Sequence, residues 1–252
     1  MKGAPFFIVG CGRSGTTALG EVLGSHPQIK YLNEPRPLWR NDPRTDVWSG
    51  KAGAGARLDL YDVDEDTRAL LRKRFFSKAG PNDRLLEKTP VNSFRIDYIR
   101  SLFPNARFLH LLRNGLHVAR SIGQRFESGG GWFGAGDVKW KLLVDYAQRH
   151  DLEAKARAAD DDGRLRGLLE WRLAVSHTRE RLTDRDLEIR YEDLVMTPQD
   201  EVRRVLDWMG LPGSDVDASV LARPLRPSEA VDEEAHLIAG DLLRELGYAP
   251  TP

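Results

Sequence analysis

The chain has 252 residues, of which 40% are hydrophobic, so it is long enough to bury a substantial core and is not of the disordered class. Its 38 basic and 38 acidic residues give a formal net charge of zero, so a generally basic surface for nucleic acid is not indicated. An anion site would have to be built locally, from placed cations and backbone N–H groups.

The N-terminal region and the cysteine content indicate the cellular compartment of the protein. The apolar run from Phe6 to Val9 is too short for a signal-peptide core or a transmembrane helix. Cys11 is the only cysteine, so no internal disulfide is possible, which fits a reducing compartment. We therefore expect a soluble cytoplasmic protein that is not integral to a membrane, with residues 1–252 forming one domain.

Strand and helix patterns alternate along the first half of the chain. A compact apolar run predicts a buried strand over 6–9, and Pro35 ends a second strand at 29–32 because proline cannot donate to a sheet. The elements predicted here, in chain order, are strand 6–9, helix 18–23, strand 29–32, helix 66–76, strand 84–87 and helix 93–102.

The second half continues the alternation. Its predicted elements are strand 108–112, helix 116–126, a glycine-rich loop over 128–136, helices 139–158 and 165–182, strand 187–191, helix 199–209 and a final helix from about 233 to 246. This order predicts an α/β protein, a P-loop-type three-layer fold with a central parallel sheet flanked by helices. Ligands of such sheets bind at the carboxyl ends of the strands.

A glycine-rich segment, Gly-Cys-Gly-Arg-Ser-Gly-Thr-Thr over 10–17, follows the first strand with the glycine spacing of a phosphate-binding loop. Backbone N–H groups and a helix N-terminus can cradle an anion there, since glycines let the backbone approach closely. Thr16 stands where the usual lysine would be, which leaves Arg13 as the only cation of the loop. A plain turn is the alternative interpretation.

The fourth strand ends in a cation, Arg113. A nucleotide-hydrolysing enzyme would tend to place an aspartate there to hold Mg²⁺. An arginine instead favours direct binding of an anion without a metal. Ser121 and Arg125 follow on the next helix, four residues apart and on one face. The alternatives are a strand-end ion pair for Arg113 and a solvated position for Ser121.

Two segments carry a family resemblance. Residues 7–17 resemble the 5′-phosphosulfate loop of sulfotransferases that use 3′-phosphoadenosine 5′-phosphosulfate (PAPS), in the Arg-Ser-Gly-Thr-Thr branch that includes carbohydrate and protein-tyrosine sulfotransferases. Residues 108–121 resemble the family's 3′-phosphate motif, although Asn114-Gly115 replaces the usual Asp-Pro or Asp-Gly. The resemblance implies PAPS as cofactor, no metal, and a set of cofactor-binding residues: Gly12, Arg13, Ser14, Gly15, Thr16, Thr17, Arg113, Ser121 and Tyr191. Arg125, on the same helix face as Ser121, completes the predicted set.

Tyr191 enters this set from a third segment. Residues 187–194 resemble the family segment whose tyrosine contacts the adenine end of the cofactor, and a core tyrosine is the alternative. The arginine- and proline-rich residues 223–228 are expected to close over the nucleotide. The loop over 129–136 is expected to gate the acceptor, with a simple connector as the alternative.

Sulfuryl transfer needs a base, cations for the leaving group and in-line reactants. Glu34, at the end of the second strand and expected beside the glycine-rich loop, is the predicted base; a surface carboxylate paired with Arg36 is the alternative. Lys88 ends the third strand in Leu-Glu-Lys-Thr-Pro, which resembles the family's Lys-Thr-Pro segment, and is the predicted leaving-group cation. Arg13 completes the catalytic set. Pro90 excludes the histidine base that the cytosolic branch carries after its Lys-Thr pair.

These residues predict a sulfotransferase that acts by in-line displacement on a hydroxyl or amine of a small-molecule or glycan acceptor, with a glycan, glycolipid or natural product favoured. Two alternatives stand beside it. A P-loop kinase or NTPase would need the loop lysine and a strand-end aspartate. A non-catalytic nucleotide-binding protein would bind the nucleotide without turnover, and the intact set of charged residues argues against it.

Overall fold

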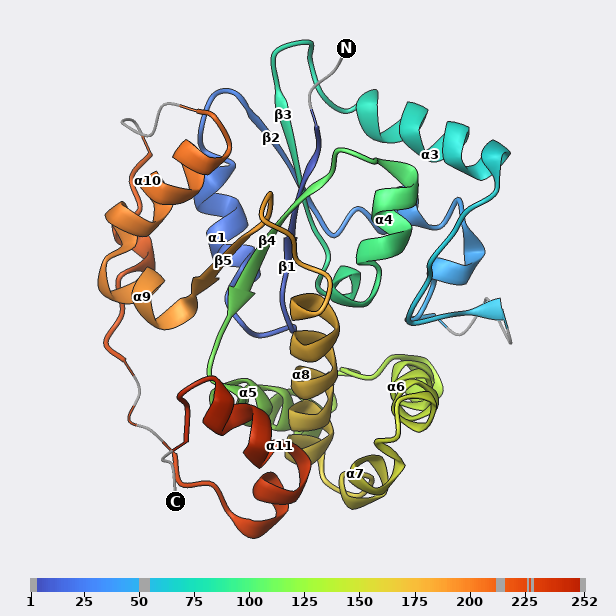
Figure 1. The fold of residues 1–252 in the computed structure, drawn as a ribbon, viewed down its shortest axis with the longest axis vertical. Coiled ribbons are helices and arrows are strands. Elements are labelled where there is room, and N and C mark those ends of the chain that lie inside the picture. The colour runs from blue at the N-terminus through green and yellow to red at the C-terminus, as the bar shows by residue number, and fades with distance from the viewer. Residues whose placement is uncertain (1–3, 50–54, 212–215, 226, 228, 250–252) are drawn as a thin grey trace.

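The computed structural model describes residues 4–49, 55–211, 216–225, 227 and 229–249. Five parallel strands form one sheet in the order β2-β3-β1-β4-β5 (Figure 1). The strands are β1 (Phe6–Val9), β2 (Ile29–Asn33), β3 (Arg84–Lys88), β4 (Arg107–Leu112) and β5 (Leu187–Arg190). The predicted α/β arrangement with a central parallel sheet is confirmed.

Helices cover both faces of the sheet because alternate strand residues point to opposite sides. Phe6 and Ile8 pack with α1 (Thr16–Leu23), α9 (Tyr191–Met196) and α10 (Pro198–Trp208). Phe7 and Val9 pack with α2 (Arg36–Trp39), α3 (Glu65–Phe76) and α4 (Ile96–Leu102) on the other face. The two helix groups lie on opposite sides of the sheet (Figure 1).

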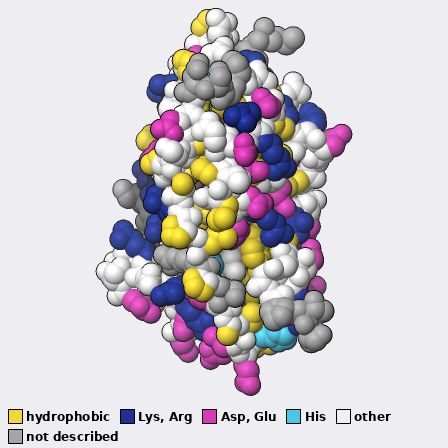
Figure 2. Space-filling model, turned by 90° about the vertical axis from the view of Figure 1, so that its left-hand side faces the viewer, with side chains coloured by type: hydrophobic (Ala, Val, Ile, Leu, Met, Phe, Trp, Pro, Cys, Tyr) yellow, Lys and Arg dark blue, Asp and Glu magenta, His cyan; other side chains and the backbone are white. Residues whose placement is uncertain are grey.

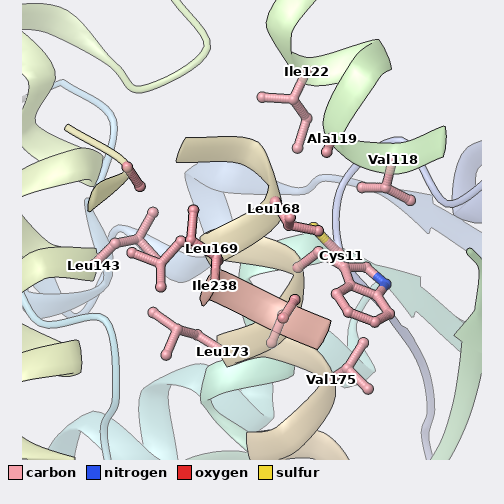
Figure 3. Close-up of a cluster of buried hydrophobic side chains, with 14 of the residues drawn as sticks. Cys11, Val118, Ala119, Ile122, Leu143, Leu168, Leu169, Leu173, Val175 and Ile238 are labelled. Atoms are coloured by element: carbon pink, nitrogen blue, oxygen red, sulfur yellow. The ribbon is translucent and has the colours of Figure 1, made fainter. Parts of the chain in front are cut away.

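A further group of helices lies beyond the carboxyl ends of the strands (Figure 1). It comprises α5 (Gly115–Glu127), α6 (Val138–Arg149), α7 (Glu153–Ala158), α8 (Gly163–Arg179) and α11 (Glu233–Glu245). They share one apolar cluster, into which Cys11 of the glycine-rich loop inserts (Figure 3). The glycine-rich loop is therefore held in place by packing of Cys11 among these helices as well as by its connection to the sheet.

The structure corrects three element boundaries. Residues 139–158 form two helices, because Asp151 adopts a left-handed φ of 59° and the Leu152 N–H turns back to the Ala147 carbonyl. The predicted helix 93–102 is a 3₁₀ turn at Pro90–Phe94 followed by α4, separated at Arg95, whose φ of −129° is not helical. Tyr191 begins α9 rather than ending β5.

Surface charge is mixed in sign. Dark blue and magenta side chains lie interspersed on the face shown in Figure 2, as the zero net charge leads one to expect. Within the described part of the chain, no helix combines the length and the apolar character needed to cross a membrane.

Candidate active site

The glycine-rich loop between β1 and α1 turns tightly, and three of its residues have a positive φ. Gly10 has a φ of 147°, Arg13 of 71° and Gly15 of 98°. The Gly10 N–H donates to the Ser93 hydroxyl over 2.8 Å, which ties the loop to the turn after β3. Gly15 is the N-cap of α1, and no side chain caps the helix at this position.

Two aromatic rings from distant segments press on the loop glycines. A Cβ on Gly15 would lie 2.9 Å from the ring of Tyr191, and a Cβ on Gly12 would lie 2.6 Å from the ring of Trp132. Both distances are shorter than side chains tolerate, so a larger residue at either position would force the neighbouring ring to move. The loop is thus sandwiched between α9 and the 128–134 loop.

A cavity of about 530 Å³ opens beside this loop and brings most predicted cofactor residues together. Among the residues lining it are Arg13, Gly15, Thr16, Thr17, Arg113, Ser121 and Tyr191. Arg13 Nε donates to Ser121 Oγ over 3.0 Å, and Arg113 Nη1 donates to the Arg13 carbonyl over 2.8 Å. The Arg113 guanidinium also lies 4.0 Å from the centre of the Tyr191 ring.

Three predicted cofactor residues do not line this cavity. Ser14 is buried beneath the loop, and Gly12 packs against Trp132. Arg125 lines a different cavity, described below. Their assignment to the cofactor stays a prediction.

The cavity also has walls that the motifs did not indicate. Glu192 accepts hydrogen bonds from the Asn114 N–H over 3.0 Å and from the Tyr248 hydroxyl over 2.9 Å, and all three residues line the cavity. Tyr248 follows α11, far along the chain from the other two residues, and no local pattern marks it. Leu221 and residues 223–225 complete this side.

The segment predicted to close over the nucleotide is placed only in part. Residues 223–225 line the cavity, and the Pro227 carbonyl lies 3.1 Å from His117 Nε2. Closure over a nucleotide stays a prediction. Arg226 and Ser228 lie outside the described residues.

Glu34 and Lys88 meet at the ends of two neighbouring strands. β3 lies between β1 and β2, so Glu34 follows a strand that does not pair with β1, the strand that leads into the loop. Glu34 and Arg13 of the loop nevertheless line one cavity, described below. Lys88 Nζ donates to Glu34 Oε1 over 2.9 Å, and Arg36 Nη2 lies 3.0 Å from Glu34 Oε2. Lys88 is 1% exposed. The Glu34 carboxylate therefore pairs with Arg36, the partner considered for it in the alternative interpretation, and also with Lys88.

Partial burial acts to raise the pKa of Glu34, but the hydrogen bonds and charges of Lys88 and Arg36 outweigh it and lower the pKa below its ordinary value. Glu34 is therefore ionised at neutral pH. Its backbone φ of 44° is left-handed, a conformation that non-glycine residues seldom adopt and that surrounding structure must enforce. The Glu34 N–H donates to the Lys88 carbonyl over 2.8 Å, which fixes this turn.

A buried carboxylate supports the same strand end from the other side. Glu87 accepts hydrogen bonds from Trp39, Thr89 and Asn92. Burial raises the pKa of Glu87 to about 7, although these three donors oppose the shift. Glu87 thereby fixes the turn that carries Ser93, the residue that holds the loop at Gly10.

A second cavity, of about 560 Å³, lies on the Glu34 side of the loop. Arg13 lines both cavities. The other charged lining residues are Glu34, Arg36, Arg125, Lys139 and Glu170, and the indoles of Trp48 and Trp132 lie among them. The 128–136 loop contributes Gly130, Gly131, Trp132, Gly134 and Ala135 to its wall. This loop therefore borders the chamber beside the candidate base.

The Sulfotransferase family matches residues 5–215. A protein-tyrosine sulfotransferase of Drosophila melanogaster is 26% identical over 214 residues, which cover 83% of this chain and 38% of the relative. Protein-tyrosine sulfotransferase 1 of Danio rerio is 24% identical over 218 residues, covering 83% of this chain and 54% of the relative. The chain thus spans about 38 to 54% of the length of these two relatives.

The fold is shared with solved structures. The crystal structure of a sulfotransferase from Alicyclobacillus acidocaldarius superposes with a TM-score of 0.55 at 18% identity, covering 90% of this chain and 88% of that one. The resemblance inferred from the glycine-rich loop and the strand-end arginine is confirmed by the family match, which includes both segments. With more than four fifths of its residues matched, this chain belongs to the sulfotransferase family.

Proposed function

We propose that the protein transfers a sulfuryl group from PAPS to a hydroxyl or amine of an acceptor. The observation that carries this proposal is the position of Arg13, which borders both a phosphate-type cavity and the chamber of Glu34. A group held at Arg13 is accessible from the donor side and from the acceptor side. In-line transfer requires this arrangement, since the attacking and leaving atoms must approach from opposite directions.

The first cavity fits the donor in charge and size. Its charged lining residues are three arginines, Arg13, Arg113 and Arg223, and one carboxylate, Glu192, whose two oxygens already accept hydrogen bonds. This excess of cations suits an anion-rich nucleotide. A volume of about 530 Å³ lies within the usual range for small-molecule sites.

Each part of the donor has residues suited to hold it. The loop amides and Arg13 would hold the phosphosulfate, while Arg113 and Ser121 would hold the 3′-phosphate. Tyr191 would contact the adenine end. When bound, PAPS supplies an activated sulfuryl group whose leaving group is a phosphate, so the chemistry needs charge stabilisation and no metal ligand from the chain.

Glu34 and Lys88 would act on the acceptor and the leaving group. The ionised Glu34 carboxylate takes the proton that the acceptor loses as its new bond to sulfur forms. The Lys88 ammonium supplies positive charge as the bond between sulfur and the phosphate oxygen breaks. Because Lys88 is nearly completely buried, its charge acts with little screening by solvent.

The acceptor that we favour is a hydroxyl of a glycan, glycolipid or natural product. A second candidate is a tyrosine hydroxyl, because the relatives from Drosophila melanogaster and Danio rerio are named protein-tyrosine sulfotransferases. Purified protein incubated with PAPS and each acceptor class, followed by mass spectrometry, separates the two candidates.

A calorimetric titration tests the donor assignment. The protein is titrated without metal against 3′-phosphoadenosine 5′-phosphate, with ATP and ATP plus Mg²⁺ as controls. Tight, metal-free binding of the bisphosphate supports the proposal, whereas preference for ATP with Mg²⁺ would identify a kinase or NTPase. The protein would be a non-catalytic nucleotide-binding protein if it bound the bisphosphate but converted no PAPS to 3′-phosphoadenosine 5′-phosphate with any acceptor.

A further inference from the structure

The second cavity has more positive than negative charge. Its lining holds four cations, Arg13, Arg36, Arg125 and Lys139, and two carboxylates, Glu34 and Glu170. Lys139 pairs with Glu170 over 2.6 Å and Arg36 pairs with Glu34 over 3.0 Å. Arg13 and Arg125 form no ion pair with any residue that the structure describes. The chamber therefore has two cations available for an anionic ligand.

Arg13 and Arg125 lie at different points along α5: Arg13 contacts the helix at Ser121, and Arg125 belongs to the helix itself. Arg13 is held by Ser121, and Arg125 lies one helical turn beyond Ser121. Arg13 also borders the first cavity, where the proposed donor binds, while Arg125 borders only the second. The charge at Arg13 is thus assigned to the transferred group. Arg125, which the sequence predicted to bind the cofactor, does not line the first cavity, so its charge is left for the acceptor.

The wall of the second cavity is an alternating stack of cations and indoles. The Arg36 guanidinium lies 4.8 Å from the Trp48 ring centre, and Lys139 Nζ lies 5.0 Å from that of Trp48 and 4.6 Å from that of Trp132. Trp132 Nε1 donates to Glu170 over 2.9 Å. The stack is thereby fixed in place by a buried ion pair and offers flat apolar surface beside the free cation.

We propose that this chamber selects an acceptor in which a ring carries both the reactive hydroxyl and an anionic group, with Arg125 binding the anion and Trp132 packing against the ring. This inference rests on the proposed sulfuryl transfer. The hydroxyl lies towards Glu34 and Arg13, and the anion lies one helical turn away at Arg125. A volume of about 560 Å³ accommodates a ring of this kind. Hydroxyaryl carboxylates and uronic acid sugars share this chemistry.

The test uses acceptor pairs that differ only in charge. Protein saturated with 3′-phosphoadenosine 5′-phosphate is titrated calorimetrically with 4-hydroxyphenylacetate and its amide, and with 4-nitrophenyl glucuronide and the matching glucoside. In at least one pair, we expect the anionic probe to bind about tenfold more tightly than its neutral counterpart, because it gains a charge-assisted hydrogen bond. The pair that shows the preference distinguishes an aryl from a sugar acceptor.

Substitutions test whether Arg125 is the residue responsible for the preference for anionic probes. Arg125→Gln is expected to reduce it to about twofold or less, and raised salt to weaken it in the unaltered protein. Arg74→Gln, an equal change of charge on the exposed side of α3 and away from both cavities, should leave it intact.

Three results would overturn the inference: equal affinities within both pairs, no binding of any of the four probes, or a preference that survives Arg125→Gln. A failure of the proposed function looks different. It would appear as absent binding of 3′-phosphoadenosine 5′-phosphate, or as absent turnover of PAPS, whatever the charge preference of the second cavity.

Discussion

Lys88 and Glu34, 54 positions apart in the sequence, form a hydrogen-bonded ion pair of 2.9 Å at the carboxyl ends of β3 and β2. The parallel register that pairs Asn33 with Lys88 delivers them to the same edge of the sheet. One buried cation and one half-buried carboxylate thus stand together beside the loop that carries Arg13. The proposed chemistry depends on this pair.

Glu34→Gln should lower kcat by about 100-fold or more, because the amide cannot take the acceptor's proton. Affinity for 3′-phosphoadenosine 5′-phosphate should stay within about twofold, since Glu34 does not line the first cavity. Steady-state kinetics and calorimetry measure the two effects. Glu65→Gln, which removes a carboxylate from an exposed pair with Arg68, is the matched control. Unchanged turnover in Glu34→Gln would remove Glu34 from the role of base.

Lys88→Met should move the acid limb of the kcat profile to higher pH. Lys88 lowers the pKa of Glu34 by hydrogen bonding and by charge, so its removal lets partial burial raise that pKa. With a raised pKa, Glu34 becomes protonated, and inactive as a base, at a higher pH than in the unaltered protein. We also expect kcat at neutral pH to fall by about 100-fold from loss of the leaving-group cation. An acid limb that stays in place would contradict the assignment of that limb to Glu34.

Arg113→Ala should weaken binding of 3′-phosphoadenosine 5′-phosphate by about tenfold or more, through loss of charge-assisted hydrogen bonds to the 3′-phosphate. Binding of adenosine 5′-monophosphate should change far less. Because Arg113 also donates to the Arg13 carbonyl, a general disturbance of the loop is the competing explanation. Equal losses for both nucleotides, measured by calorimetry, would favour that explanation over a 3′-phosphate site.

Gly15→Ala should lower the free energy of unfolding by about 1–3 kcal/mol and weaken nucleotide binding, since it combines a left-handed φ with a clash against Tyr191. Gly129→Ala is the matched control: its φ of 71° is also left-handed, but no neighbouring atom lies within 4 Å of the added Cβ. Urea denaturation of both variants separates backbone strain from contact with the ring. Equal destabilisation would mean that the Tyr191 contact contributes nothing.

Stability should fall as pH rises from about 4.5 to about 7 because of Glu87. Its folded pKa of about 7 exceeds the ordinary value of 4.5, so between these values the folded state binds a proton that the unfolded state has lost. The free energy of unfolding therefore decreases with pH in this window, by a total on the order of 3 kcal/mol from this group. Glu87→Gln removes the ionisation and should flatten the profile measured by urea denaturation. A slope that persists in the variant would assign it to another group.

The strand ends and the glycine-rich loop could be predicted from the sequence because the signals are local. The loop's glycines at positions 10 and 15 adopt the positive φ that their spacing indicated, and Arg113 follows directly on an apolar strand. Since parallel strands end at one edge of a sheet, placing a residue at a strand end also places it near the site. The break at Asp151 escaped prediction, as a left-handed aspartate in an otherwise helical pattern has no clear sequence signal.

Contacts between remote segments were decided only by the tertiary structure. Nothing local to Trp132 indicates that its ring covers Gly12, or that Glu170 holds it there. Helical spacing placed Arg125 on one face with Ser121, yet a turn of α5 separates the two side chains enough that they border different cavities. The sequence by itself determined the α/β class, the phosphate-type loop and the family. Which charges remain unpaired, and towards which chamber they point, depended on side-chain packing across the fold, because such contacts join residues that no sequence period relates.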